Sequence, residues 1–349
     1  FFLQKLIKEI NIFIESNSWI QEQNCFAEFF ANGKEVVPII EAAIGRVSSL
    51  PNRNRIRKAL QNQLKQVQQE NTKLVTNEVL EKRGWNIYQS WITSIPLEMG
   101  LSPMSIASKA LDEAINRSSP YGMYVTAIDK PDGEWEIEKN MNNGLYTNAV
   151  MTLPTGVQAV SEAKYKNSTQ VLHYLNQLAN SFSYKTPGTL HEMSPSGGCF
   201  VQAWSIYSIS VPIINGIFGI SSKYNIESGY TITISPLFPS TWNYMNIDNY
   251  IIGENGSSLS MHCKGNWNVK FECEIDLVNH PNNNIDVFFE LNFLQESLIK
   301  AKEYKIYLGN DLVKEKVKND SITFQLKSKT KVDTWVVKLI SSQNIHDEL

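Results

Sequence analysis

The spacing of hydrophobic residues changes near residue 222, and this change constrains the fold more than any other feature of the chain. Before it, apolar residues recur every three or four positions, as in residues 3–14, where they would form one stripe along a helix. After it, apolar and polar residues alternate, as in residues 230–234, which is typical of strands with one buried face. The sequence therefore predicts an α domain over residues 1–222 and a separate β domain over residues 223–349.

Several helices are predicted in the first domain, and short connections join most of them. They cover the residues 3–14, 36–47, 54–81, 103–115, 155–165 and 171–182, followed by an apolar helix after Gly198. We expect Ser102 to cap the helix that follows it, with Pro103 at the first helical position. Short connections favour antiparallel helix pairs, which can form a bundle, a solenoid or a closed α/α toroid. Periodicity alone does not choose among these three.

The alternating segments of the second domain have no helices between them, so they predict an antiparallel β-sandwich. The chain contains four cysteines, which we interpret as free and mostly buried thiols. A disulfide between Cys263 and Cys273 is disfavoured in this interpretation. A hairpin that reverses at residues 264–266 would place Cys273 opposite Leu259 instead.

Charge and composition exclude several classes of partner. The formal net charge is −3, so no basic field attracts nucleic acid or an anionic membrane. No apolar run approaches the roughly 20 residues of a membrane-spanning helix. The five histidines are scattered, without HExxH spacing, and the sequence has no CxxC pair and no glycine-rich phosphate loop. We therefore expect no metal, no other cofactor, no nucleic acid and no membrane, whereas the oligomeric state stays open.

The compartment has two interpretations. The last four residues, 346–349, read HDEL, which is a retrieval signal for the endoplasmic reticulum if the host is eukaryotic and the terminus is native. The usage of Asn, Ile and Lys fits an AT-rich bacterium equally, and in that case a cytoplasmic location is favoured and HDEL carries no meaning.

Carboxylates are the candidate catalytic groups. Glu192 follows His191 in a loop rich in Pro, Gly and Ser, with aromatic residues nearby, and three further candidates lie in the long irregular segment 118–154: Asp129, Asp132 and Glu134. Glycoside hydrolysis needs two carboxyl groups, one as acid and one as base or nucleophile. The alternatives are an ordinary connecting loop around Glu192, a solvated acidic loop at 132–138, and a histidine with a structural partner.

The string GTLHEMSPSGGCFVQAWSIYSI, at residues 188–209, resembles a segment of glycogen-debranching amylo-α-1,6-glucosidases and α-L-rhamnosidase-like glycoside hydrolases. In that segment a Glu-bearing loop precedes a helix that begins GCxxQAWS. Three earlier strings resemble motifs of the same group in the same order: RGWNIYQSWITSIPLEMGL, YGMYVTAID and NNGLYTNAVMTLPTGVQAVSEAKY. The strand YTITISPLFPSTW after the last helix is similar to the start of their C-terminal domain.

This resemblance implies an (α/α)6 toroid, an inverting mechanism and an oligosaccharide or polysaccharide substrate. Glu192 would be the general base, and Asp129, Asp132 or Glu134 would be the acid. The sugar site would be lined by Trp85, Trp91, Trp135, Asn143, His191, Gln202 and Trp204. About seven or eight helices are predicted, fewer than the twelve of a closed toroid. We therefore expect the toroid to be incomplete in this chain, or the chain to be a reduced relative.

Two other functions compete with hydrolysis. The first is a non-catalytic component that binds glycans or assembles with other proteins, and that retains the pocket without a complete catalytic pair. The second is a purely structural helical scaffold, which a dry apolar centre and a solvent-facing Glu192 would support. The sequence does not identify the sugar or the linkage.

Overall fold

A computed structural model describes the chain over the residues 2–73, 81–133, 150–182, 187–194, 197–199, 202–254, 256–266, 270–278, 285–292, 304–308, 311–312, 321–326 and 332–341. The chain forms two compact units. Unit 1 comprises residues 1–165 and 173–209, and unit 2 comprises residues 166–172 and 210–349. The predicted domain boundary at residue 222 stays a prediction.

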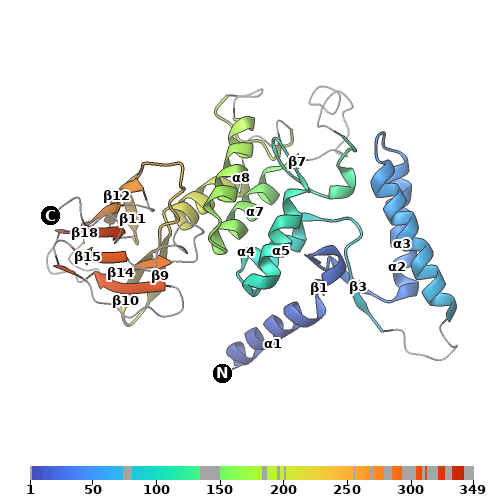
Figure 1. Cartoon of the computed structure of the whole chain (residues 1–349), viewed down its shortest axis with the longest axis horizontal. Helices are drawn as coiled ribbons and strands as arrows, with labels where there is room; N and C mark the ends of the chain where they lie inside the picture. The colour runs from blue at the N-terminus through green and yellow to red at the C-terminus, as the bar shows by residue number, and fades with distance from the viewer. Residues whose placement is uncertain are drawn as a thin grey trace. The chain divides into compact units, whose positions relative to one another are not determined.

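Helices dominate the first 211 residues, as predicted (Figure 1). Their bounds are α1 (Phe2–Asn17), α2 (Gly33–Ser48), α3 (Asn54–Lys73), α4 (Ile95–Glu98), α5 (Met104–Ile115), α7 (Thr152–Lys164), α8 (Ser168–Ser181) and α9 (Ala203–Val211). A 3-10 turn, η2 (Trp91–Ser94), leads into α4, and a π-helical turn, η5 (Pro212–Ile217), follows α9. The apolar helix predicted after Gly198 thus begins at Ala203, and its α-helical part ends at Val211.

The N-termini of α2 and α5 differ in how they are capped. At α2, the Asn32 side chain accepts hydrogen bonds from the backbone N–H groups of Lys34 and Glu35, at 3.0 Å each. The Glu35 carboxylate accepts in return from the Asn32 N–H at 2.9 Å, which completes a capping box. At α5, the N-cap residue is Pro103, with φ −64° and ψ 150°, and not Ser102 as we predicted. The helix therefore begins one residue later.

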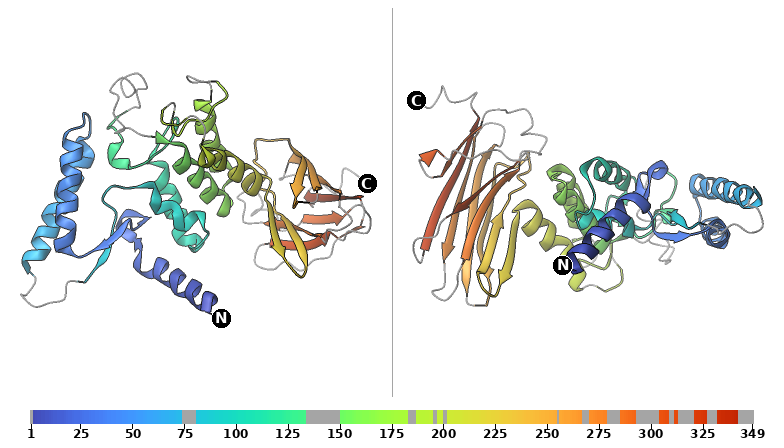
Figure 2. Two further views of the ribbon diagram at one scale, coloured as in Figure 1. Left: turned by 180° about the vertical axis from the view of Figure 1, so that it is seen from behind. Right: turned by 90° about the horizontal axis from the view of Figure 1, so that it is seen from below.

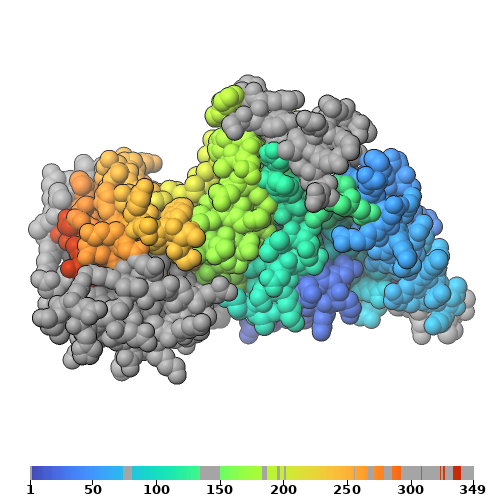
Figure 3. All heavy atoms as spheres, turned by 45° about the horizontal axis from the view of Figure 1, so that its top comes forward, coloured from blue at the N-terminus to red at the C-terminus, as the bar shows by residue number. Residues whose placement is uncertain are grey.

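Helices α2 and α3 pack side by side at one edge of unit 1, shown in blue (Figure 3). Their shared core includes Val36, Ile40, Leu60 and Val67, all buried. These residues are spaced by four within α2 and by seven within α3, so each helix presents one apolar stripe to the other. The opposite face of α3 is polar, as its sequence indicated.

The central helix of unit 1 is α7. Every residue from Pro154 to Ala163 is buried, and α7 contacts α4, α5 and η2. It comes close to α9 at Gly156, where an added Cβ would lie 2.3 Å from the Cα of Ser208. Only a residue without a side chain allows the two backbones to come this close. Because the whole stretch from Pro154 to Ala163 is buried, the polar residues of α7 also lie inside the unit.

Short strands tie the loops of unit 1 together. A four-stranded antiparallel sheet has the order β5-β6-β7-β8, with β5 (Ser118–Ser119), β6 (Gly122–Tyr124), β7 (Val150–Met151) and β8 (Met193–Ser194). Two further pairs are β1 (Trp19–Ile20) with β2 (Cys25–Phe26), and β3 (Phe29–Ala31) with β4 (Arg83–Trp85). No strands were predicted here, because runs of two or three residues are too short for a period to be recognised.

A single carboxylate organises the segment that follows β4. Glu28 accepts hydrogen bonds from the backbone N–H groups of Ile87 and Tyr88, at 2.9 Å each, and from that of Ser90. Its own N–H donates to the carbonyl of Trp85 at 2.8 Å. Glu28 thereby satisfies three backbone donors in a loop that has no strand partner for them.

Unit 2 contains two larger sheets (Figure 2). The six-stranded antiparallel sheet has the order β11 (Tyr244–Ile252), β12 (Ser257–Asn266), β13 (Lys270–Val278), β18 (Val332–Ser341), β15 (Tyr304–Leu308) and β16 (Asp311–Leu312). The four-stranded sheet has the order β17 (Ser321–Leu326), β14 (Ile285–Asn292), β10 (Gly229–Ile234) and β9 (Ile220–Asn225). The alternating segments 230–234, 259–263, 271–275, 304–308, 322–326 and 335–339 are strands, as predicted, and Trp267 and Val269 of the predicted segment 267–275 lie outside the described residues.

The architecture is a mixture of helices and sheets, which confirms the coarse prediction. One pair, β10 with β14, is parallel, so the four-stranded sheet is not purely antiparallel. The part of the chain that the structure describes does not confirm a toroid and shows no distinct sandwich, so both stay predictions. Among the described helices, none is long and apolar enough to span a membrane.

The prediction about the cysteines of unit 2 was wrong. Cys263 and Cys273 lie directly opposite each other on β12 and β13 and form a disulfide. The ladder continues as far as the pair Asn266 and Lys270, so the hairpin reverses later than the expected residues 264–266. Of the other two cysteines, which are free thiols, Cys25 is buried and Cys199 is exposed.

Candidate active site

The loop that carries Glu192 is closed by backbone hydrogen bonds. The N–H of Glu192 donates to the carbonyl of Cys199 at 2.8 Å, and the N–H of Met193 donates to that of Gly197 at 3.1 Å. The N–H of Thr152, at the start of α7, donates to the Glu192 carbonyl at 3.0 Å. Glu192 is therefore fixed at both its backbone groups, between strand β8 and the central helix.

Gly198 leaves room for the Glu192 carboxylate, because it has no side chain. The Cys199 N–H donates to Oε2 of Glu192 at 3.3 Å. A Cβ at Gly198 would lie 2.5 Å from the same oxygen, and the residue has a φ of +63°, which favours glycine. Glu192 makes no hydrogen bond through Oε1 to any residue that the structure describes. One carboxylate oxygen is thus held by the backbone and the other is left for a further partner.

Several polar side chains close to Glu192 in sequence lack hydrogen-bond partners among the described residues. These buried atoms are both ring nitrogens of His191, Oε1 of Gln202 and the hydroxyl of Ser194. The backbone of His191 is fixed, because its carbonyl accepts from the Thr152 hydroxyl. Buried polar groups are nearly always satisfied in proteins, so a cluster of unsatisfied groups in one loop favours a bound polar molecule.

Trp204 adds an aromatic surface to this segment. It lies in the first turn of α9, two residues after Gln202, and 41% of its surface is exposed. An exposed indole offers a flat apolar face against which a ring can stack. We call the four residues His191, Glu192, Gln202 and Trp204, which are close in sequence, the Glu192 cluster.

Asp129 lies in a buried ionic contact. Its Oδ2 accepts from the Arg46 guanidinium at 2.6 Å and from the Thr126 hydroxyl at 2.5 Å. Arg53 donates to the Asp129 backbone carbonyl at 2.5 Å. Burial raises the pKa of the Asp129 carboxyl, and the hydrogen bond from Thr126 and the charges of Arg46 and Arg53 oppose this rise. The carboxyl therefore joins the last turns of α2 to the segment after β6, and the Asp129 carbonyl joins that segment to Arg53, between α2 and α3.

Asp132 supports the backbone near the start of α3. Its Oδ2 accepts from the N–H of Arg55 at 3.0 Å, and its N–H donates to the carbonyl of Asn52 at 2.6 Å. No hydrogen bond or ion pair joins Asp129 or Asp132 to Glu192 among the described residues. The remaining candidates in this segment lie outside the described residues: Glu134, Trp135 and Asn143.

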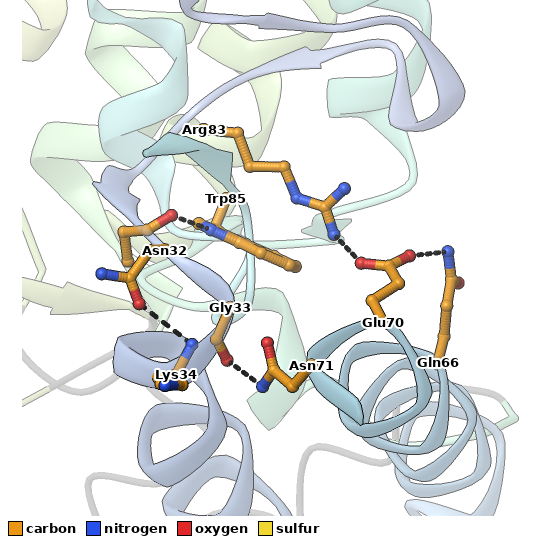
Figure 4. Close-up of polar contacts among 9 residues, drawn as sticks. Asn32, Gly33, Lys34, Gln66, Glu70, Asn71, Arg83 and Trp85 are labelled. Carbon is orange, nitrogen blue, oxygen red and sulfur yellow. Dashed lines mark hydrogen bonds and ion pairs between the residues drawn. The ribbon is translucent and has the colours of Figure 1, made fainter. Parts of the chain in front are cut away.

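Two predicted tryptophans lie on other elements. Trp85 in β4 is buried, its indole N–H donates to the Ala31 carbonyl at 2.8 Å, and the Arg83 guanidinium lies 4.2 Å from its ring centre (Figure 4). Trp91 begins η2, where its N–H donates to the Val125 carbonyl at 3.1 Å. The structure brings neither ring into a hydrogen bond with the Glu192 cluster. Their role in sugar binding stays a prediction.

Sequence reasoning missed a buried carboxylate and its phenol. Glu98, at the end of α4, is 9% exposed and accepts a hydrogen bond from the hydroxyl of Tyr207 in α9. Burial, this hydrogen bond and the charge of Glu98 all raise the pKa of Tyr207 well above its usual range. A glutamate within the apolar string IPLEM was the only sign in the sequence, and its partner is 109 residues away.

The centre of unit 1 is polar as well as buried. Gln158 on α7 accepts from the Ser94 hydroxyl at 2.8 Å and donates to Glu162 at 3.4 Å. The dry, apolar centre that would support a purely structural scaffold is therefore not what these residues form. No group of His, Cys, Asp and Glu that could hold a metal ion occurs among the described residues.

Comparisons with known proteins do not establish a family for this chain. No family model matches the sequence. No curated protein matches it either. Among solved structures, a GH127 beta-arabinofuranosidase aligns with 97% of this chain and 49% of its own, at 9% identity and a TM-score of 0.25. The chain thus spans about half the length of that protein, and a TM-score this low does not establish a common fold.

Proposed function

We propose that the chain is a glycoside hydrolase that acts on an α-linked glycan with inversion, and that Glu192 is the general base. The observation that supports this proposal is the Glu192 cluster: a carboxylate with one oxygen held by the backbone, and buried polar groups of His191 and Gln202, close in sequence, without described partners. Sugar hydroxyls both donate and accept hydrogen bonds, so they complement an imidazole and an amide.

The chemistry assigns each group a role. Ionised Glu192 would accept a proton from water through its unbound oxygen while that water attacks the anomeric carbon. His191 and Gln202 would orient sugar hydroxyls, and the exposed face of Trp204 would stack against a ring. The acid would be Asp129, Asp132 or Glu134. The raised pKa of Asp129 favours a proton-donating role, whereas its ion pair with Arg46 does not.

Replacing Glu192 by Gln tests the base. We expect turnover to fall by roughly 10²–10⁴-fold, the contribution typical of a general acid or base, while folding is kept because Gln has nearly the same shape. Turnover is measured as sugar released from a panel of α-linked oligosaccharides, with the first anomer formed followed by NMR. Glu41→Gln, at an exposed position of α2, is the matched control and should retain parental turnover. Parental turnover in Glu192→Gln would refute the assignment.

A second candidate function is glycan binding without hydrolysis. It is favoured by one observation: Asp129 and Asp132, the two described candidates for the acid, both serve local structure. In this case the parent chain binds oligosaccharides in calorimetry but releases no sugar from any member of the panel. Release of free sugar that depends on Glu192 would exclude this function.

A further inference from the structure

Unit 1 contains a pocket of about 450 Å³ formed by elements that carry none of the Glu192 cluster. The end of α1, the β1 segment, the polar face of α3 and strand β4 line it. Its volume falls in the range of sites for small organic ligands, roughly 300–1,000 Å³. Any ligand of this pocket would therefore bind away from the Glu192 cluster.

Neutral amides predominate among the polar groups of this pocket. Gln63 and Gln66 come from α3, and Asn86 follows β4. Each amide offers two N–H donors and one carbonyl acceptor, so together they complement a ligand that both donates and accepts hydrogen bonds at several positions. A row of hydroxyl groups has this property, and a phosphate or carboxylate, which only accepts, does not.

Asn86 supplies the most specific sign of a ligand. Only 3% of its surface is exposed, and its Nδ2 donates to the Cys25 sulfur at 2.8 Å. Its Oδ1 is buried and has no hydrogen-bond partner among the described residues. A buried acceptor without a donor costs free energy, so a donor from a bound molecule at this position would be favourable.

The wall carries two charged residues, Glu22 and Arg83, and Arg83 is already paired. The Arg83 guanidinium lies over the Trp85 ring and pairs with Glu70 at 3.0 Å, and Gln66 donates to the same carboxylate at 2.9 Å (Figure 4). Arg83 is therefore already engaged by an acid and does not favour an anionic ligand. The aromatic surface comes from Trp19, which is half-buried and held edge-on by Phe26, with ring centres 5.3 Å apart.

We infer that this pocket is a second carbohydrate site that binds a neutral sugar independently of the Glu192 cluster. Trp19 contacts the apolar face of the sugar ring, and the amides of Gln63 and Asn86 exchange hydrogen bonds with its hydroxyls. Glu22 is the carboxylate among the lining residues, and Glu70 is engaged by Arg83, so we expect the site to bind sugar without the acid and base pair that cleavage requires. The inference does not depend on hydrolysis at Glu192.

Ligand-observed NMR on the full chain tests this site, with glucose, galactose, mannose, arabinose and rhamnose as probes. Gln63→Leu should weaken binding of the recognised sugar by roughly 10-fold, because an amide that binds hydroxyls becomes apolar at nearly the same volume. Gln61→Leu is the matched control, since this exposed residue lies on the same helix outside the pocket, and it should bind as the parent does.

Two further variants separate this site from the proposed active site. Trp19→Phe should also weaken binding, because it keeps an aromatic ring but reduces the stacking surface, and circular dichroism verifies that it folds. Glu192→Gln should leave binding at the pocket unchanged. The inference is overturned if no sugar of the panel binds, if Gln63→Leu binds like the parent, or if Glu192→Gln removes the same signal.

Discussion

Helix α7 of unit 1 and strand β12 of unit 2 both bury side chains, but α7 buries several polar groups among its apolar ones, whereas the buried side chains of β12 are mostly apolar, with Ser257 as the exception. On α7, Gln158, Ser161 and Glu162 have no exposed surface. On β12, the inward residues are Leu259 and Met261, which are equally inaccessible. One centre is thus built from groups that need hydrogen-bond partners, and the other from groups that need only to leave water.

This difference separates a region held mainly by apolar burial from one in which buried polar groups also hydrogen-bond to one another. Apolar burial contributes about 25 cal/mol for each Å² removed from water and tolerates many arrangements. Buried amides and carboxylates add little net stability even when they are satisfied, and they fix one geometry. We therefore expect substitutions in β12 to act through lost burial, and substitutions around α7 to act through lost packing or lost hydrogen bonds.

The largest effect is expected at β12. Leu259→Ala should lower the free energy of unfolding by about 3–4 kcal/mol, because the side chain is fully buried and leaves a cavity. Ile251→Ala on the neighbouring strand β11, where the side chain is 60% exposed, should cost less than about 1 kcal/mol. Urea unfolding of the full chain measures both. Equal losses in the two variants would contradict the apolar description of this sheet.

A smaller loss is expected where α7 meets α9. Gly156→Ala places a Cβ 2.3 Å from the Cα of Ser208, so the two helices must separate, at a cost of about 2–3 kcal/mol. Gly45→Ala is the matched control, since nothing lies within 4 Å of its Cβ position in α2. That control should stabilise the chain by about 0.5–1 kcal/mol through helix propensity. Thermal unfolding distinguishes the opposite signs.

The smallest loss is expected when a polar contact of unit 1 is removed. Tyr207→Phe should cost about 1.5–2 kcal/mol at pH 7, because the Glu98 carboxylate stays buried without its donor. Tyr244→Phe, with 70% of the side chain exposed, should have almost no effect. Denaturant titration of both variants provides the measurement.

The contact between Tyr207 and Glu98 also has a pH dependence of defined sign. Folding raises the pKa of Tyr207 above its ordinary value of 10.0, so its contribution is fully present below pH 10 and is lost as the pH rises through the higher folded value. The difference in stability between the parent and Tyr207→Phe should therefore be constant from pH 7 to 9 and shrink above pH 10. A difference that grows in this range would show that the phenol is not held as a donor.

The strands could be predicted from the sequence because their period is local. Leu259, Met261 and Cys263 were assigned to one face by alternation alone, and all three are buried. The disulfide was missed because strand register depends on where the hairpin reverses. A shift of the turn by two residues moves the partner of Cys273 from Leu259 to Cys263, and alternation is identical in both registers.

The candidate site was only partly predictable, for a related reason. Glu192 and His191 are adjacent in sequence, so their association was visible directly. The pair of Glu98 and Tyr207 forms only when α4 and α9 meet, and no spacing in one sequence encodes that meeting. Likewise, Asp129 was predicted from its type and neighbourhood, whereas its contact with Arg46 depends on the packing of elements 83 residues apart.

The Glu28 carboxylate has a consequence for how the chain can be shortened. The segment that begins at Ile87 owes three of its backbone bonds to a residue nearly sixty positions earlier. A shortened form that starts after Glu28 would leave these backbone N–H groups without their acceptor. We expect the segment from Trp85 to Trp91 to become less ordered in that form, although none of its own residues has changed. Glu28 is thus an internal brace for this region.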